Sequence, residues 1–173
     1  KILAHSSIAG AYLFTGQEGL GKYLAAVNFA KAANCLEKTE DACDGCVSCM
    51  KIDKGQHPDV HFISPQESGA IKIEHIRALK KDIAYRPYEA KKKVFIINDA
   101  HNLTAEASNA LLKTLEEPAG ESVIILVSAK PNLLFKTIVS RCQIIKFHSM
   151  PREELEGMLG SEYRLDRPSA HFL

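Results

Sequence analysis

The sequence predicts an α/β fold with a largely parallel, five-stranded sheet covered by helices on both faces. Short apolar runs rich in β-branched and aromatic residues alternate with stretches of helical periodicity, and this alternation is typical of parallel sheets. The first apolar run is followed by a glycine-rich loop and then by an apolar helix. Since ligands of such sheets bind at the carboxyl ends of the strands, the glycine-rich loop is expected at the ligand-binding edge.

The elements follow one another in a regular order along the chain. Strands are expected at 12–14, 60–63, 94–97, 123–127 and 144–147. Helices are expected at 24–33, at 73–84, from Thr104 to Pro118, in a short stretch at 132–139, and from Pro151 onward. Thr104 has the side chain of a helix N-cap, and Pro118 cannot continue a helix.

The chain is expected to contain one main domain and the beginning of a second. Residues 1–150 carry all five strands, and the segment at about 34–54 is an excursion from the core that contains four cysteines. Residues 151–173 open with proline and acidic residues, as helix starts favour, and they are expected to begin a small helical domain that is cut short.

Composition indicates an ordinary soluble protein of the cytosol. The 173 residues are 46% hydrophobic and 25% charged, and the net charge of +1 does not predict a strong field for nucleic acid. No apolar run approaches the ~20 residues of a membrane span, and the first residues lack the apolar region of a signal peptide. The chain begins and ends abruptly, so we expect it to be a fragment.

The glycine-rich loop matches a phosphate-binding loop except at its last position. Residues 16–22 fit the pattern G-x-x-x-x-G-K, in which backbone N–H groups and a helix start favour an anion and the lysine reaches the outer phosphates. The pattern continues with Ser or Thr, whose hydroxyl holds Mg²⁺, but Tyr23 stands there and its phenol lies too far from its backbone. We expect a loop that keeps its shape and loses its metal, with candidate nucleotide-binding positions at Gly16, Gly19, Gly21, Lys22 and Tyr23.

Polar residues at later strand ends give less specific signals. Asn98 stands where an ATPase would have an acid for Mg²⁺, and its neutral amide is a poorer ligand; Asp99 remains as a second acid. An Asx turn explains this pair about equally well. Ser128 could face a γ-phosphate or be a plain turn residue, and spacing alone makes Arg141 an exposed arginine.

Four of the five cysteines form a cluster that predicts a structural zinc site. Four thiolates close the tetrahedral shell of Zn²⁺ and leave no position for a reactive water. Free surface thiols are the alternative, and Cys142 stands apart. The predicted ligands are Cys35, Cys43, Cys46 and Cys49.

Taken together, these motifs resemble those of bacterial DNA polymerase III clamp-loader subunits. A Leu-Leu-Lys-Thr-Leu-Glu-Glu-Pro block and a Ser-Arg-Cys block are specific to such subunits, and the His-Pro-Asp and Ile-x-Ile-x-x-Ile-Arg motifs point to the delta-prime type. The motifs lie, in order, at 16–22, 35–49, 56–59, 71–77, 111–118 and 140–142. The resemblance implies an AAA+ fold with a zinc module inserted after the first helix, in a three-domain subunit whose collar domain is missing here.

The resemblance also implies a role. Delta-prime occupies one end of a five-subunit ring, with delta and the tau/gamma motor subunits, that opens the sliding clamp and places it on primed DNA. Arg141 then matches the arginine that points into a neighbouring motor subunit's ATP site, and Ser128 matches the sensor position. Because Tyr23 and Asn98 remove both side-chain Mg²⁺ ligands, we expect a stator without ATPase activity of its own. Whether its loop keeps ATP stays open.

Two other functions are compatible with parts of the sequence. An ATP-hydrolysing tau/gamma-like motor subunit is supported by the intact glycines and Lys22 and opposed by Tyr23 and Asn98. A basic stripe would support a third function, a zinc-stabilised DNA-binding adaptor with a relic ATPase fold. The near-neutral charge does not supply such a stripe.

Overall fold

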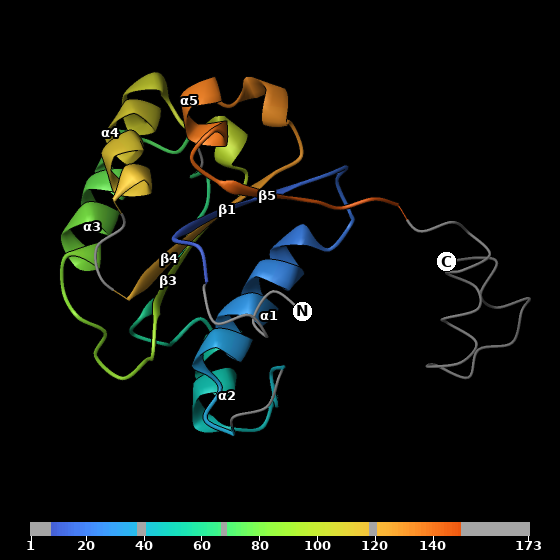
Figure 1. The fold of residues 1–173 in the computed structure, drawn as a ribbon, viewed down its shortest axis with the longest axis vertical. Coiled ribbons are helices and arrows are strands. Elements are labelled where there is room, and N and C mark those ends of the chain that lie inside the picture. The colour runs from blue at the N-terminus through green and yellow to red at the C-terminus, as the bar shows by residue number, and fades with distance from the viewer. Residues whose placement is uncertain (1–7, 38–40, 67–68, 118–120, 150–173) are drawn as a thin grey trace, which may run out of the picture.

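A parallel β-sheet forms the centre of the structure (Figure 1). The computed structural model describes residues 8–37, 41–66, 69–117 and 121–149. In these residues the sheet has five strands in the order β2-β3-β4-β1-β5, and each neighbouring pair is parallel. The predicted parallel α/β sheet is therefore confirmed. The strands are β1 (Ala11–Thr15), β2 (Val60–Ile63), β3 (Lys93–Ile97), β4 (Ser122–Ser128) and β5 (Gln143–Lys146).

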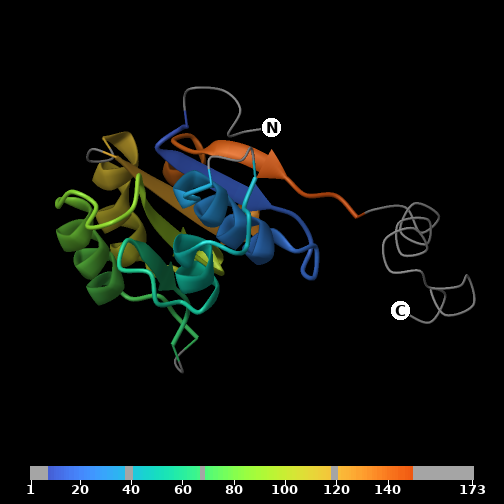
Figure 2. The same cartoon turned by 90° about the horizontal axis from the view of Figure 1, so that it is seen from below.

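Helices cover both faces of the sheet, so the molecule has three layers (Figures 1 and 2). One face packs on α1 and α2 through a core that includes Phe14, Phe29 and Ile52. The other face packs on α3, α4 and α5 through a second core that includes Leu111. The helices are α1 (Lys22–Asn34), α2 (Val47–Asp53), α3 (Ile73–Ile83), α4 (Ala105–Glu116) and α5 (Lys136–Val139), with 3₁₀ turns η1 (Ala100–Asn102) and η2 (Pro131–Leu133).

The three central strands are buried along their whole length. All residues of β1, β3 and β4 are buried, which explains why these strands are continuous apolar runs rather than alternating patterns. The edge strands β2 and β5 are shorter and more exposed. The burial of β1, β3 and β4 fixes the positions of the loops at their carboxyl ends.

Two sequence-based expectations about local structure are wrong in detail. The stretch at 132–139 is not one helix: η2 and α5 are separated by extended backbone at Leu134 and Phe135, which lets the Leu134 side chain enter the core. The cysteine segment is not wholly an excursion either, because α2 packs on α1, and its Cys49 and Ile52 are buried.

Some expectations fall on residues outside the described ranges. These are the helix stop at Pro118 and the helical domain begun by 151–173. Among the helices that the structure describes, none is both long and apolar enough to cross a membrane.

Candidate functional site

A pocket of about 400 Å³ lies at the carboxyl edge of the sheet, where the ends of β1, β3 and β4 meet. It adjoins the N-terminus of α1, so it occupies the position predicted for a phosphate site. The structure brings six of the predicted residues together in its lining: Gly19, Gly21, Lys22, Tyr23, Asn98 and Asp99.

The glycines of the loop are required by its backbone. Gly16 has a φ of 148°, and a Cβ there would lie 2.5 Å from the carbonyl oxygen of Phe147, which excludes any larger residue without rearrangement. Gly19 and Gly21 have φ values of 80° and 72°, which L-residues with side chains rarely adopt. Gly21 is also the N-cap of α1, and no side chain caps this helix start. The loop has therefore kept the backbone shape that the pattern predicts.

Lys22 lies against its own loop. The residue is buried, and its Nζ donates a hydrogen bond to the backbone carbonyl of Gln17. This contact places the ammonium group within the loop, where it balances the carbonyl dipole.

Tyr23 is oriented by packing on β2. Its ring centroid lies 6.2 Å from that of Phe62, and the side chain remains 43% exposed. Partial burial raises the pKa of the phenol above its ordinary value. The short hydroxyl that normally completes the loop is absent, and the aromatic ring contributes a packing contact instead.

Asn98 and Asp99 bond to each other at the end of β3. The Asn98 side-chain amide donates to the Asp99 carboxylate at 3.1 Å, and Asp99 has a left-handed φ of 49°. Asn98 is neutral, so the pocket presents one carboxylate from this strand end rather than two.

Ser128 is fully buried and lies outside the pocket lining. Its hydroxyl is 3.3 Å from Nδ1 of His101 and accepts a hydrogen bond from the backbone N–H of Lys130. The suggestion that Ser128 faces a γ-phosphate stays a prediction. Its contact with His101 was not foreseen, because a hydrogen bond between the end of β4 and the turn η1 has no local sequence signal.

Arg141 lies at the amino ends of the strands, whereas the glycine loop lies at their carboxyl ends. β1 and β5 are parallel, with Tyr12 opposite Gln143 and Thr15 opposite Lys146. Arg141 comes just before β5, at its amino end, whereas the loop follows the carboxyl end of β1. Its guanidinium bonds to the Glu116 carboxylate, with Nε at 2.8 Å, and to the Thr137 carbonyl at 2.9 Å. Arg141 therefore cannot reach the pocket of its own chain.

The four clustered cysteines converge at the other end of α1. Their Sγ atoms all lie within 4.8 Å of one another, and none forms a disulfide. Tetrahedral Zn²⁺ with Zn–S bonds of ~2.3 Å needs sulfurs about 3.8 Å apart, so these residues fit such an ion. The backbone N–H of Cys46 donates to Sγ of Cys43 at 3.3 Å, and that of Cys49 to Sγ of Cys46 at 3.5 Å. These bonds orient the Sγ atoms of Cys43 and Cys46.

The thiols of the cluster differ in acidity. Backbone N–H groups of Leu36 and Cys49 lower the pKa of Cys46. Burial, followed by the hydrogen bond with Cys46, raises the pKa of Cys49 to about 12. A metal deprotonates a coordinating thiol, so binding to this set should release protons and weaken as pH falls.

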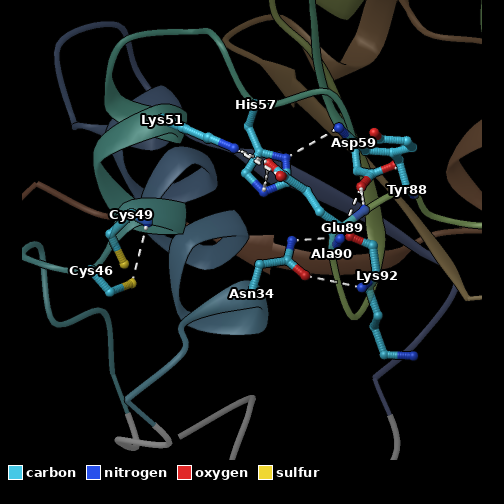
Figure 3. Close-up of polar contacts among 10 residues, drawn as sticks. All are labelled: Asn34, Cys46, Cys49, Lys51, His57, Asp59, Tyr88, Glu89, Ala90 and Lys92. Carbon is cyan, nitrogen blue, oxygen red and sulfur yellow. Dashed lines mark hydrogen bonds and ion pairs between the residues drawn. The ribbon is translucent and has the colours of Figure 1, made fainter.

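A buried carboxylate close to the four-cysteine segment at about 34–54 is not predicted by the sequence. Asp59 is 1% exposed and accepts hydrogen bonds from the backbone N–H groups of Tyr88, Glu89 and Ala90, at 2.8, 2.8 and 2.9 Å (Figure 3). The sequence indicates only a turn at 56–59. An acidic residue directly before an expected strand was the one available signal.

Comparison with known proteins identifies the family. The family model described as DNA polymerase III, delta subunit, matches residues 1–151. The chain belongs to this family. DNA polymerase III subunit delta' of Bacillus subtilis is 39% identical over 88% of the chain and 46% of that protein. Subunit tau of the same organism is 35% identical over 91% of the chain and 28% of that protein. The chain thus spans less than half of these relatives, and both subunit types match at similar identity.

Solved structures support the fold. A DNA polymerase III gamma subunit-related protein from Thermotoga maritima superposes with a TM-score of 0.64 at 23% identity, over 90% of this chain and 46% of that one. The Thermotoga maritima RuvB Holliday junction branch migration motor gives a TM-score of 0.58 at 16% identity, over 94% and 47%. At these identities the likeness concerns the fold alone, and it confirms the AAA+ fold that the resemblance implied.

Proposed function

We propose that this chain is the AAA+ part of a delta-prime-type clamp-loader subunit of the bacterial DNA polymerase III holoenzyme, which acts in the cytoplasm as a stator during ATP-dependent loading of the sliding clamp. Its partners would be the tau/gamma motor subunits and delta in a five-subunit ring, and through that ring the clamp and primed DNA. Residues 1–150 would form the AAA+ domain, and 151–173 the start of a lid domain.

The pocket at the carboxyl edge is the observation that carries this proposal. Its glycine loop has the backbone of a phosphate site, but Tyr23 packs on Phe62 and the Asn98 amide bonds to Asp99. Phosphoryl transfer depends on Mg²⁺ to neutralise developing charge. A pocket that lacks both usual Mg²⁺ ligands can support structure and assembly but is poorly suited to hydrolysis.

Arg141 would act on a nucleotide held by a neighbouring subunit. Its place at the amino edge of the sheet excludes its own pocket and leaves it at the surface. In its present conformation it pairs with Glu116, and such a partly exposed ion pair contributes only ~0–1 kcal/mol. Release from Glu116 would therefore cost little, and a guanidinium can fork two hydrogen bonds onto phosphate oxygens.

The four cysteines would hold one structural Zn²⁺. When bound, the ion supplies a cross-link between the end of α1, the loop at 41–46 and α2. Because four thiolates complete its coordination, it takes no part in a reaction.

Substitution of Arg141 tests the proposed role. In a clamp loader reconstituted with the full-length subunit, Arg141→Ala should leave the subunit folded and able to join the ring, but should lower DNA-stimulated ATPase activity and clamp loading. An arginine acting in trans contributes ~10³ to 10⁵ in GTPases, and we expect less here because a ring has several active sites. Arg141→Lys should restore little, since an ammonium cannot reproduce the fork.

Glu116→Gln is the matched control, because it removes the same ion pair and leaves the arginine in place. Its complex should retain wild-type loading. If the Arg141→Ala complex also loads clamps at the wild-type rate, the trans-acting assignment is wrong and the Ser-Arg-Cys motif is a packing motif.

The alternative of a working motor subunit is favoured by the intact loop backbone and Lys22. Calorimetry with ATP and Mg²⁺ on the full-length protein separates the two roles. Turnover that disappears in Lys22→Ala would support the motor, whereas weak binding without turnover agrees with the stator.

A further inference from the structure

The segment of residues 88–92, which leads into β3, is held in place almost entirely by polar contacts. On one side the Asp59 carboxylate accepts the backbone N–H groups of Tyr88, Glu89 and Ala90. Tyr88 itself is 87% exposed, so its side chain does not anchor the segment. The position of this segment therefore depends on the groups that surround it (Figure 3).

On its other side, the segment is hydrogen-bonded to Asn34 and Cys35, where the four-cysteine segment at about 34–54 begins. The Asn34 side chain pairs with the backbone of Lys92, donating to its carbonyl and accepting from its N–H, both at 3.0 Å. The Lys91 Nζ donates to the backbone carbonyl of Cys35 at 2.6 Å. Cys35 is one of the four clustered cysteines, so the segment touches a metal-binding residue directly.

A third connection comes from α2, which carries two of the cysteines. The Lys51 ammonium bonds to both Glu89 carboxylate oxygens at 2.7 and 2.8 Å, and the buried His57 ring lies 3.6 Å from the same carboxylate. Cys46 caps α2, and Cys49 anchors its first turn in the core. An ion that holds these two cysteines in place would therefore also hold α2, the helix from which Lys51 reaches Glu89.

We propose that metal binding by the cysteine cluster orders the segment of residues 88–92, and that Lys91 is a positioning residue that links the two. This inference rests on the proposed zinc site. Four thiolates and one Zn²⁺ carry a net charge of −2, and the Lys91 ammonium on the Cys35 carbonyl places a positive charge beside them. Since coupling between two equilibria is reciprocal, a change that weakens the Lys91 contact must also weaken metal retention.

The consequence is a surface whose order depends on the metal. The segment carries the exposed ring of Tyr88 and continues directly into β3, whose far end holds Asn98 and Asp99. Loss of the metal would release Cys35 and α2, and two of the three sets of contacts that hold the segment would weaken together. The Asp59 contacts and the ion pair of Lys92 with Glu121 are independent of the cysteines.

Residues 1–173 contain no tryptophan, so Tyr88→Trp introduces a fluorescent reporter at an exposed position of this part of the protein. Any tryptophan elsewhere in the full-length protein is replaced by phenylalanine in both the variant and its reference. In the full-length protein, chelation of zinc should lower the fluorescence anisotropy of this reporter and speed amide exchange at 88–92 about tenfold or more. Exchange in the buried strand β4, which is hydrogen-bonded to β1 on one side and to β3 on the other, should change much less. Re-addition of zinc should reverse both effects.

A second experiment substitutes Lys91 and uses its neighbour Lys92 as the matched control. Lys92 directs its ammonium to Glu121 instead, away from the cysteines. Lys91→Met should speed zinc release to a chromophoric chelator about tenfold, in the range of substitutions next to metal ligands, while Lys92→Met should stay within about twofold of wild type.

The outcomes separate the two proposals. If purified wild-type protein contains no zinc and takes none up, the metal site is wrong and this inference is wrong with it. If it holds about one zinc per chain but exchange at 88–92 is unchanged by chelation, the coupling alone is overturned. If the two lysine variants release zinc at the same rate, Lys91 does not couple the metal site to the segment.

Discussion

At the scale of single residues, Asp59 shows how a charge can be stable inside the protein. Burial by itself would raise the pKa of its carboxyl, but hydrogen bonds from three backbone N–H groups outweigh burial and hold the pKa below its ordinary value. The carboxylate replaces the water that would otherwise bind these N–H groups. It thereby ties two parts of the chain that are about 30 residues apart.

Asp59→Asn should lower the free energy of unfolding by about 2–3 kcal/mol, because an amide has one acceptor oxygen for three donors and these partly buried N–H groups lose partners. Its pH dependence follows from the depressed pKa. The stabilisation by Asp59 is complete above the unfolded pKa of ~3.9 and is lost as pH falls through the folded value, so wild type should lose stability in acid more steeply than the variant. Urea unfolding at a series of pH values measures both effects.

The exposed carboxylate Glu74 provides the control for this measurement. Glu74→Gln should change the free energy of unfolding by no more than ~0.5 kcal/mol at any pH. An Asp59→Asn protein as stable as this control at neutral pH would contradict the role given to Asp59.

At the scale of elements, α4 shows how local signals and packing act together. Its N-cap Thr104 accepts a hydrogen bond from the backbone N–H of Ala107 at 3.2 Å, as its position before the apolar periodicity predicts. Ala107, Leu111 and Leu115 are buried on one side of the helix and pack on α3 and the sheet. The cap defines where the helix begins, and the apolar face defines which side it buries.

Thr104→Ala should reduce the free energy of unfolding by about 1 kcal/mol, because the N–H group of the first turn loses its partner. Thr104→Ser retains the hydroxyl and should recover most of that loss. Thermal unfolding of the three proteins with saturating zinc compares them under equal conditions. Equal midpoints for the alanine and serine variants would show that the hydroxyl is not the stabilising group.

At the scale of the whole molecule, the sheet separates the two candidate sites in space. The glycine loop with its pocket lies at the carboxyl edge, and Arg141 lies at the amino edge. A chain built in this way can offer its arginine to a neighbour while its own pocket serves another purpose. This separation is a consequence of parallel strands, in which all carboxyl ends lie at one edge.

Restoring the two departures from the ATPase pattern tests what the pocket lacks. The double variant Tyr23→Thr and Asn98→Asp should bind ATP with Mg²⁺ more tightly than wild type, because it regains a short hydroxyl and a second carboxylate for the metal. Calorimetry with and without Mg²⁺ measures the difference. Wild-type protein that already binds the magnesium complex as tightly as the double variant would argue against the stator.

Most elements, and the candidate sites that they carry, can be predicted from the sequence alone, although α2 was missed. Periodicity predicts the five strands and the main helices because burial on one or both faces leaves a local pattern of apolar residues. The glycine pattern predicts a loop with positive φ, and the cysteine spacing predicts four sulfurs that can converge. Each of these features is encoded within about 15 residues of continuous chain.

How these elements meet becomes visible in the folded structure. The strand order placed Asn98 and Asp99 beside the glycine loop and Arg141 at the far edge. It also brought Lys91 to the carbonyl of Cys35, a contact between residues 56 positions apart. Such contacts depend on strand pairing and on the packing of two helical layers, which sum many weak interactions over the whole chain. No short stretch of sequence contains that sum, so the position of each site relative to the others emerges only in the folded molecule.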